Sequence, residues 1–135
     1  MSEQIEEYRV ESSCIFCSQH IENRIIARYG SVVALEDKYP VTKGHTLIIP
    51  ISHRDDYFSM TEMEKRDAEA LILQLRQQLL AEDPEISGFN IGMNCGEDAG
   101  QTVMHAHIYL IPRRKGDVEN PRGGVRHVIP GDGFY

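Results

Sequence analysis

The chain has 135 residues, which fits a single domain with a hydrophobic core of its own. No apolar run approaches the length of a membrane span, and the first seven residues are acidic rather than signal-like, so we expect a soluble, cytoplasmic protein that does not contact a membrane. The net charge of −7 argues against nonspecific binding to nucleic acid, because such binding depends on Lys and Arg side chains that neutralise phosphates.

The first motif is a CxxC, Cys14-Ile-Phe-Cys17. In a cytoplasmic chain a disulfide is the less common use of such a pair, and the βαβ setting of a redox motif is not evident here. Zinc needs four nitrogen or sulfur ligands, and a CxxC supplies two of them. The motif therefore suits half of a zinc site, with His20, three residues past Cys17, as an alternative fourth ligand, or else two free thiols. The third cysteine, Cys95, receives no role.

The next elements alternate between strands and turns. Residues 24–36 read as two short strands around a turn at Gly30, and residues 45–50 form a β-branched strand entered through Gly44. His45 is expected to make a local hydrogen bond at the start of that strand rather than to bind a ligand. These short segments predict part of a largely antiparallel sheet.

A helix follows, because Thr61-Glu-Met-Glu64 is a capping box. Apolar residues recur at helical spacing until Glu-Asp-Pro84 ends the helix; they are Ala68, Leu71, Ile72, Leu75 and Leu79. Residues 89–94 and 103–111 then read as a pair of strands joined by a glycine-containing turn. The order of strands, helix and strands predicts an α+β fold with an antiparallel sheet and one long helix.

The strand at 103–111 carries the candidate chemistry. With a period of two, one face holds Val103, His105, His107 and Tyr109, and the other holds Met104, Ala106, Ile108 and Leu110. The second set is typical of a core face. The first set aligns two imidazoles and a phenol on a rigid element, as a reactive histidine requires.

Beyond residue 115 the chain is rich in glycine and proline and is expected to form an extended tail. Basic residues gather around its start; they are Arg113, Arg114, Lys115, Arg122 and Arg126. They suit either a local anionic ligand or a solvated basic tail. His127, also in the tail, is more typical of a solvated histidine than of a substrate contact.

Several blocks in this order resemble the histidine-triad (HIT) superfamily of nucleotide hydrolases and transferases. The signature block is Gln101-Thr-Val-Met-His105-Ala-His107-Ile-Tyr109-Leu-Ile-Pro-Arg113; an upstream block spans 34–53, a preceding strand 88–94, and a tail 113–130. The tail is similar to that of dinucleoside-polyphosphate-hydrolase-like bacterial and archaeal members. The resemblance implies a HIT domain over 1–115 with an N-terminal zinc knuckle, an extended tail over 116–135, and a homodimer.

The resemblance also implies roles for single residues. His107 would be the nucleophile that forms a nucleotidyl-histidine intermediate, and the main-chain carbonyl of His105 would orient it. The substrate-binding positions would be Asp37 for the ribose hydroxyls, and Asn94, Gln101 and Thr102 for phosphate. Apolar residues near Ile15, Phe16 and Leu35 could enclose the base, which is expected to be adenine.

The metal ligands follow from the same resemblance. Many bacterial members with a similar CxxC complete a structural Cys2His2 zinc site, and the matching positions here are Cys14, Cys17, His53 and His105. Such a site would be closed, with no position for an activated water.

One position departs from the family pattern, because the third triad histidine is Tyr109 here. A phenol donates one hydrogen bond but stays neutral at neutral pH. We therefore expect an active enzyme with an altered preference for the leaving group. The leading interpretation is a hydrolase of dinucleoside polyphosphates such as diadenosine tetraphosphate. The alternatives are a nucleoside phosphoramidase, a nucleotidyltransferase or phosphorylase, and a nucleotide-binding protein without catalysis.

Overall fold

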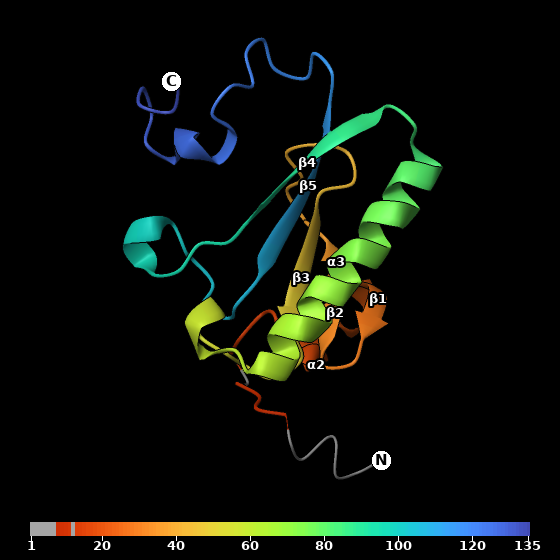
Figure 1. The fold of residues 1–135 in the computed structure, drawn as a ribbon. Coiled ribbons are helices and arrows are strands. Elements are labelled where there is room, and N and C mark those ends of the chain that lie inside the picture. Colours follow the sequence, from red (N-terminus) through yellow and green to blue (C-terminus); the bar gives the residue numbers. More distant parts are fainter. Residues whose placement is uncertain (1–7, 12) are drawn as a thin grey trace.

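The fold was described from a computed structural model, which covers residues 8–11 and 13–135. Within them the chain forms one long helix and a five-stranded antiparallel sheet (Figure 1), and this confirms the predicted α+β class. No helix in these residues is long and apolar enough to cross a membrane. The acidic segment 1–7, which supported the expected cytoplasmic location, lies outside the described residues.

The sheet has the order β1-β2-β3-β5-β4, and every neighbouring pair is antiparallel. The strands are β1 (Ile25–Tyr29), β2 (Val32–Glu36), β3 (Thr46–Pro50), β4 (Ile86–Gly92) and β5 (Ile108–Arg114). All of β3 and most of β2 are buried, as expected for strands with apolar side chains on both faces. The predicted strands around Gly30 and after Gly44 are therefore confirmed.

Helix α3 (Glu62–Glu82) lies across one face of the sheet (Figure 1). Its N-terminus has the predicted capping box, in which the Thr61 hydroxyl accepts from the Glu64 amide and the Glu64 carboxylate accepts from the Thr61 amide. Its buried stripe packs on alternate residues of β2, β3 and β5 and consists of Ala68, Leu71 and Leu75, with Ile72 and Leu79 half-buried.

The opposite face of the sheet is covered by the N-terminal segment. Phe16, which precedes the short helix α2 (Ser18–Ile21), and Ile21, the last residue of that helix, pack with Leu35, Leu47 and Ile49. Short 3-10 turns complete the fold at Glu22–Arg24, Tyr57–Ser59, Glu97–Ala99 and Gly124–Val128. The CxxC segment is thereby held against the sheet near the start of β5.

The final strand pair differs from the prediction at its inner ends. β5 begins at Ile108 rather than at residue 103, so His105 and His107 lie in the connection that leads into it. Ala106 donates its amide to the Arg54 carbonyl at 2.7 Å, which ties this connection to the loop after β3 instead of to β4. Met104, predicted to face the core, is 43% exposed, whereas Ala106, Ile108 and Leu110 are buried as predicted.

The tail after β5 turns back toward β4 and contains the 3-10 turn at Gly124–Val128. Its first basic residues are engaged in the fold, because Arg113 binds both oxygens of Asp117 at 2.8 Å and Arg114 binds Asp83 at 2.8 Å. The Arg113 guanidinium holds the pKa of the Asp117 carboxyl well below its usual range. Two of the five clustered basic side chains therefore stabilise the start of the tail.

Candidate active site and metal centre

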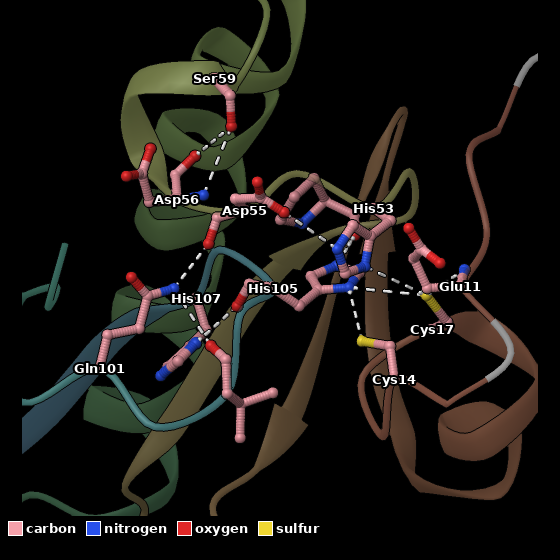
Figure 2. Close-up of polar contacts among 12 residues, drawn as sticks. Glu11, Cys14, Cys17, His53, Asp55, Asp56, Ser59, Gln101, His105 and His107 are labelled. Carbon is pink, nitrogen blue, oxygen red and sulfur yellow. Dashed lines mark hydrogen bonds and ion pairs between the residues drawn. The ribbon is translucent and has the colours of Figure 1, made fainter. Parts of the chain in front are cut away.

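The connection into β5 is anchored by a buried glutamine. The Gln101 side chain accepts from the Gly96 amide at 2.8 Å and donates to the carbonyls of Asp55 at 2.6 Å and Val103 at 3.1 Å. Figure 2 shows this side chain reaching toward the Asp55 loop beside the two histidines. These bonds fix the backbone from which His105 and His107 project.

Four side chains meet beside this connection. The ligand atoms of Cys14, Cys17, His53 and His105 all lie within 4.8 Å of one another (Figure 2). The Nδ1 atom of His105 is 3.3 Å from the Cys14 sulfur and 3.7 Å from the Cys17 sulfur, and the Nδ1 atom of His53 is 3.6 Å from the Cys17 sulfur. A loop of the N-terminal segment, the loop after β3 and the approach to β5 thus converge on one point.

The remaining ring nitrogens are occupied by oxygen acceptors. His105 Nε2–H donates to the Pro50 carbonyl at 2.8 Å, and His53 Nε2–H donates to Asp55 Oδ1 at 3.2 Å. Both rings are therefore in the tautomer that directs the Nδ1 lone pair at the sulfurs. Carbonyl and carboxylate partners of this kind orient histidine ligands in metal sites.

Burial changes the pKa values of two of these four side chains in ways that bear on metal binding. It lowers the pKa of the fully buried His105 to about 4, so its imidazole is neutral at pH 7. Burial also raises the pKa of the Cys17 thiol, so a thiolate at this position needs a positive partner. A divalent cation would supply that charge.

The donor set fits zinc. Tetrahedral zinc with ordinary Zn–S and Zn–N bonds separates sulfur from nitrogen by about 3.5 Å, close to the 3.3–3.7 Å found here. The four residues can therefore hold a metal ion, and they are the four that the sequence predicted. Neither His20 nor Cys95 belongs to this cluster of the described chain, and all three cysteines are free thiols.

His107 lies next to the cluster but has a different environment. Its Nδ1–H donates to the His105 carbonyl at 2.8 Å, which leaves the lone pair on Nε2. The Tyr109 hydroxyl lies 3.3 Å from that Nε2 atom, and the edge of the Phe16 ring packs on the imidazole at a centroid distance of 5.1 Å. The ring is thus fixed on three sides.

A cavity of about 500 Å³ opens in front of His107. Its walls bring together residues from five segments; they are Ile15, Phe16, His20, Arg24, Asp37, Lys38, Tyr39, Leu47, Thr102, Val103, His107 and Tyr109. Asp37 accepts the Tyr39 amide at 2.7 Å through Oδ1. Burial, and secondarily the Asp37 charge, raise the pKa of Tyr109, so this phenol stays neutral.

Not every predicted site residue lines this cavity. Asp37, Thr102, His107 and Tyr109 line it together with Ile15 and Phe16, whereas Asn94, Gln101 and Leu35 do not. The polar atoms of Gln101 are bound to backbone groups, and Leu35 is fully buried in the sheet core. Asn94 lies half-buried in the connection after β4.

The environment of His45 goes beyond what the sequence predicted. Its Nδ1 atom accepts the Val41 amide at 3.1 Å, which is the local bond expected at a strand start. Its Nε2 atom, however, faces Asp37 Oδ2 at 3.4 Å, and its ring packs on that of Tyr109 at a centroid distance of 5.5 Å. The only available signal was that Asp37 and His45 flank a loop containing Pro40 and Gly44, whose closure brings its ends together.

Comparisons with known proteins show which family the chain resembles. The model of the HIT domain matches residues 18–116. Protein hit of Bacillus subtilis is 37% identical over 110 residues, which cover 78% of this chain and 74% of that protein. The asymmetrical bis(5′-nucleosyl)-tetraphosphatase of Schizosaccharomyces pombe is 37% identical over 97 residues, covering 72% of this chain and 53% of that enzyme.

A solved structure of a Zn-bound histidine triad family protein from Mycobacterium smegmatis is similar as well, with a TM-score of 0.69 at 31% identity over 78% of each chain. The matched segment contains the long helix, the whole sheet and the histidine connection. The chain therefore belongs to the HIT family.

Proposed function

We propose that this protein is a nucleotide hydrolase that cleaves the α-phosphate linkage of a dinucleoside polyphosphate, such as diadenosine tetraphosphate, through a nucleotidyl-histidine intermediate on His107. The observation that carries the proposal is the orientation of this ring, whose Nδ1–H is bound to the His105 carbonyl while Nε2 keeps its lone pair beside an open cavity. A neutral imidazole held in this way is a competent nucleophile at neutral pH.

The reaction would take place in two displacements. In the first, His107 Nε2 forms a bond to the α-phosphorus as the bond from that phosphorus to the bridging oxygen breaks, and the leaving polyphosphate keeps the electron pair. The positive charge on the ring is stabilised by the hydrogen bond from Nδ1–H to the His105 carbonyl. In the second, water attacks the same phosphorus as the bond from phosphorus to Nε2 breaks and its electron pair returns to Nε2. A nucleoside monophosphate leaves, the attacking water gives up a proton to solvent, and neutral His107 is restored.

Tyr109 bears on the choice of leaving group. An amine leaves a phosphoramidate only after it receives a proton, and a phenol whose pKa is raised by burial is a poor acid. A polyphosphate leaves as a stable anion and needs only a hydrogen bond, which the Tyr109 hydroxyl can donate. A tyrosine at position 109 therefore favours a polyphosphate substrate over a phosphoramidate.

The cavity offers contacts for the rest of the substrate. We assign the ribose hydroxyls to Asp37 and the base to the apolar wall of Ile15 and Phe16, all of which line the cavity. Thr102 would contact phosphate directly. Gln101 would act by holding the backbone of this segment, and Asn94 would reach phosphate from the connection after β4.

We assign structural zinc to Cys14, Cys17, His53 and His105. When bound, the ion would cross-link the N-terminal segment to the approach to β5. The chain's own contribution to the reaction through these residues is positional, because Phe16 stands between the two cysteines and packs against His107. We also propose a homodimer, which light scattering tests directly.

A second candidate function rests on the contact between Tyr109 and His107. If the phenol keeps donating to Nε2 at the 3.3 Å contact, it occupies the lone pair that must attack phosphorus. The protein would then bind nucleotides with little turnover. Rapid-quench labelling separates the two candidates, because a hydrolase gives a burst of nucleotidylated protein and a binding protein gives none.

The decisive experiment compares diadenosine tetraphosphate with an adenosine phosphoramidate, for the wild type and for His107→Ala. Release of AMP from the tetraphosphate that is lost in the variant supports the hydrolase. Preference for the phosphoramidate, or formation of ADP only when phosphate is added, would instead favour a phosphoramidase or a phosphorylase. Binding of nucleotide without release from either compound would favour the non-catalytic candidate.

A further inference from the structure

His45 is a buried histidine to which neither the metal cluster nor the two displacements give a role. It stands directly before β3, is 4% exposed, and packs beside Tyr109 at the wall of the cavity. It does not line the cavity itself. His45 can therefore affect a ligand in the cavity only through the residues that it contacts.

The hydrogen bond at Nδ1 determines its protonation. Because the Val41 amide donates to this nitrogen at 3.1 Å, Nδ1 carries no proton and the proton of the neutral ring is on Nε2. Burial lowers the pKa of His45, which keeps the ring in this neutral form. Its Nε2 atom is buried and lacks a completed hydrogen bond among the described residues, although Asp37 Oδ2 is only 3.4 Å away.

Asp37 is held from several directions. Its Oδ1 atom accepts the Tyr39 amide at 2.7 Å, and its own amide donates to the His45 carbonyl at 3.0 Å. The loop between Asp37 and His45 is closed further by the His45 amide, which donates to the Thr42 carbonyl at 3.2 Å. His45 Nε2–H faces Oδ2 at 3.4 Å without completing a hydrogen bond, Oδ1 has the Tyr39 amide as its donor, and Asp37 lines the cavity.

We propose that His45 is the positioning residue that makes this site selective for ribonucleotides. It fixes the Asp37 carboxylate so that both oxygens accept from the neighbouring 2′ and 3′ hydroxyls of a ribose. The inference rests on the proposed nucleotide site and adds its sugar selectivity. A free carboxylate would rotate and would lose orientational entropy on binding the diol, whereas one clamped by Tyr39 and His45 is already in place.

The test measures the ratio of affinities for AMP and for 2′,3′-dideoxy-AMP by calorimetry. We expect the wild type to prefer AMP by about tenfold or more, as a lost hydrogen bond to a charged group would give. His45→Leu should reduce the ratio to within about twofold by weakening AMP alone. His45→Gln, whose amide can donate at similar reach, should keep most of the ratio. In an Asp37→Asn background, His45→Leu should change the ratio no further.

An unchanged ratio in folded His45→Leu would overturn the role of His45. A wild type that binds both nucleotides equally would also overturn it, yet would leave the hydrolase intact if AMP release still depends on His107. If His45→Leu does not fold, nitrogen NMR of the wild type decides. The Nε2–H tautomer and a shift of its signal with AMP but not with dideoxy-AMP are expected, and the opposite tautomer or an equal response to both contradicts the proposal.

Discussion

The candidate metal cluster of Cys14, Cys17, His53 and His105 and the His107 cavity are neighbours in space, but they differ in how much open volume adjoins their histidines. At the cluster, four ligand atoms lie within 4.8 Å of one another and His105 is fully buried. Two residues later, His107 borders an open space of about 500 Å³. A histidine whose surroundings are filled by other ligands serves structure, and one with an open approach can serve chemistry.

The two regions share Phe16 and the backbone of His105. The Phe16 ring lies edge-on to both imidazoles, at centroid distances of 6.3 Å from His105 and 5.1 Å from His107. The His105 side chain belongs to the cluster, while its carbonyl holds His107. We therefore expect that a substitution in the cavity leaves metal binding by the cluster unchanged. A substitution in the cluster should, in contrast, weaken nucleotide binding in the cavity.

The largest effect is expected from His107→Ala. Turnover of diadenosine tetraphosphate should fall by on the order of 10³-fold or more, because the nucleophile is removed. Zinc content, measured by atomic emission, should stay at one ion per chain. His127→Ala, which changes a tail histidine outside the cavity wall, is the matched control. Loss of zinc in His107→Ala would show that metal binding by the cluster depends on this cavity residue.

Cys17→Ser, a substitution in the cluster, should affect the cavity as well as the cluster. We expect loss of stoichiometric zinc and a fall in Tm of roughly 5 °C or more, because metal binding contributes to the folding free energy. AMP affinity should weaken too, since Phe16 loses its fixed place on His107. Cys95→Ser, which leaves the cluster complete, is the control. Full AMP affinity in a zinc-free variant would break the proposed link between the regions.

Acidification should destabilise the metal-free protein. Burial lowers the pKa of His105 to about 4, against an ordinary value near 6.5, and it lowers the pKa of His45 in the same direction. Between those values the unfolded chain binds more protons than the folded one, so stability falls as pH falls. Urea unfolding should show a loss of about 2 kcal/mol from His105 between pH 7 and pH 5. Equal stability at both values would mean that the empty cluster opens to water.

The smallest effect is expected from Thr61→Ala, because Thr61 neither lines the cavity nor belongs to the cluster of Cys14, Cys17, His53 and His105. Removing the side-chain acceptor of the α3 capping box should cost about 1 kcal/mol of unfolding free energy, measured by urea titration. Zinc content and turnover should stay as in the wild type. A change in zinc content or turnover would show that a loss of stability by itself affects the two regions. The effects predicted for His107→Ala and Cys17→Ser would then have to be corrected for their loss of stability.

The fold was predictable where local signals agree with burial. Thr61 and Glu64 determine the start of α3, and the spacing of Ala68, Leu71 and Leu75 determines the face that it buries. The approach to β5 was not predictable in the same way. Its alternating pattern continues through residues 103–107, but long-range bonds from Gln101 and Ala106 to the loop after β3 replace the strand pairing there.

The candidate site also has features that could be predicted from the sequence and features that could not. The residue types of the CxxC and the histidine connection indicated metal and nucleophile chemistry, and the structure brings the four predicted ligands together. The contact of His45 with Asp37 could not be read from the sequence, because it depends on how the loop between them closes. Gln101 has the residue type of a substrate contact, but its side chain makes hydrogen bonds to the backbone of Gly96 and Asp55.

The sequence spacing of the four clustered side chains has a consequence for how the protein is made. Cys17 and His105 are 88 residues apart in the chain, so the cluster cannot be completed until most of the chain has been synthesised. During synthesis the CxxC emerges long before its histidine partners. If the cluster holds zinc as proposed, uptake of the ion would be a late event in synthesis, and a chain truncated before His105 would lack one of the four ligands.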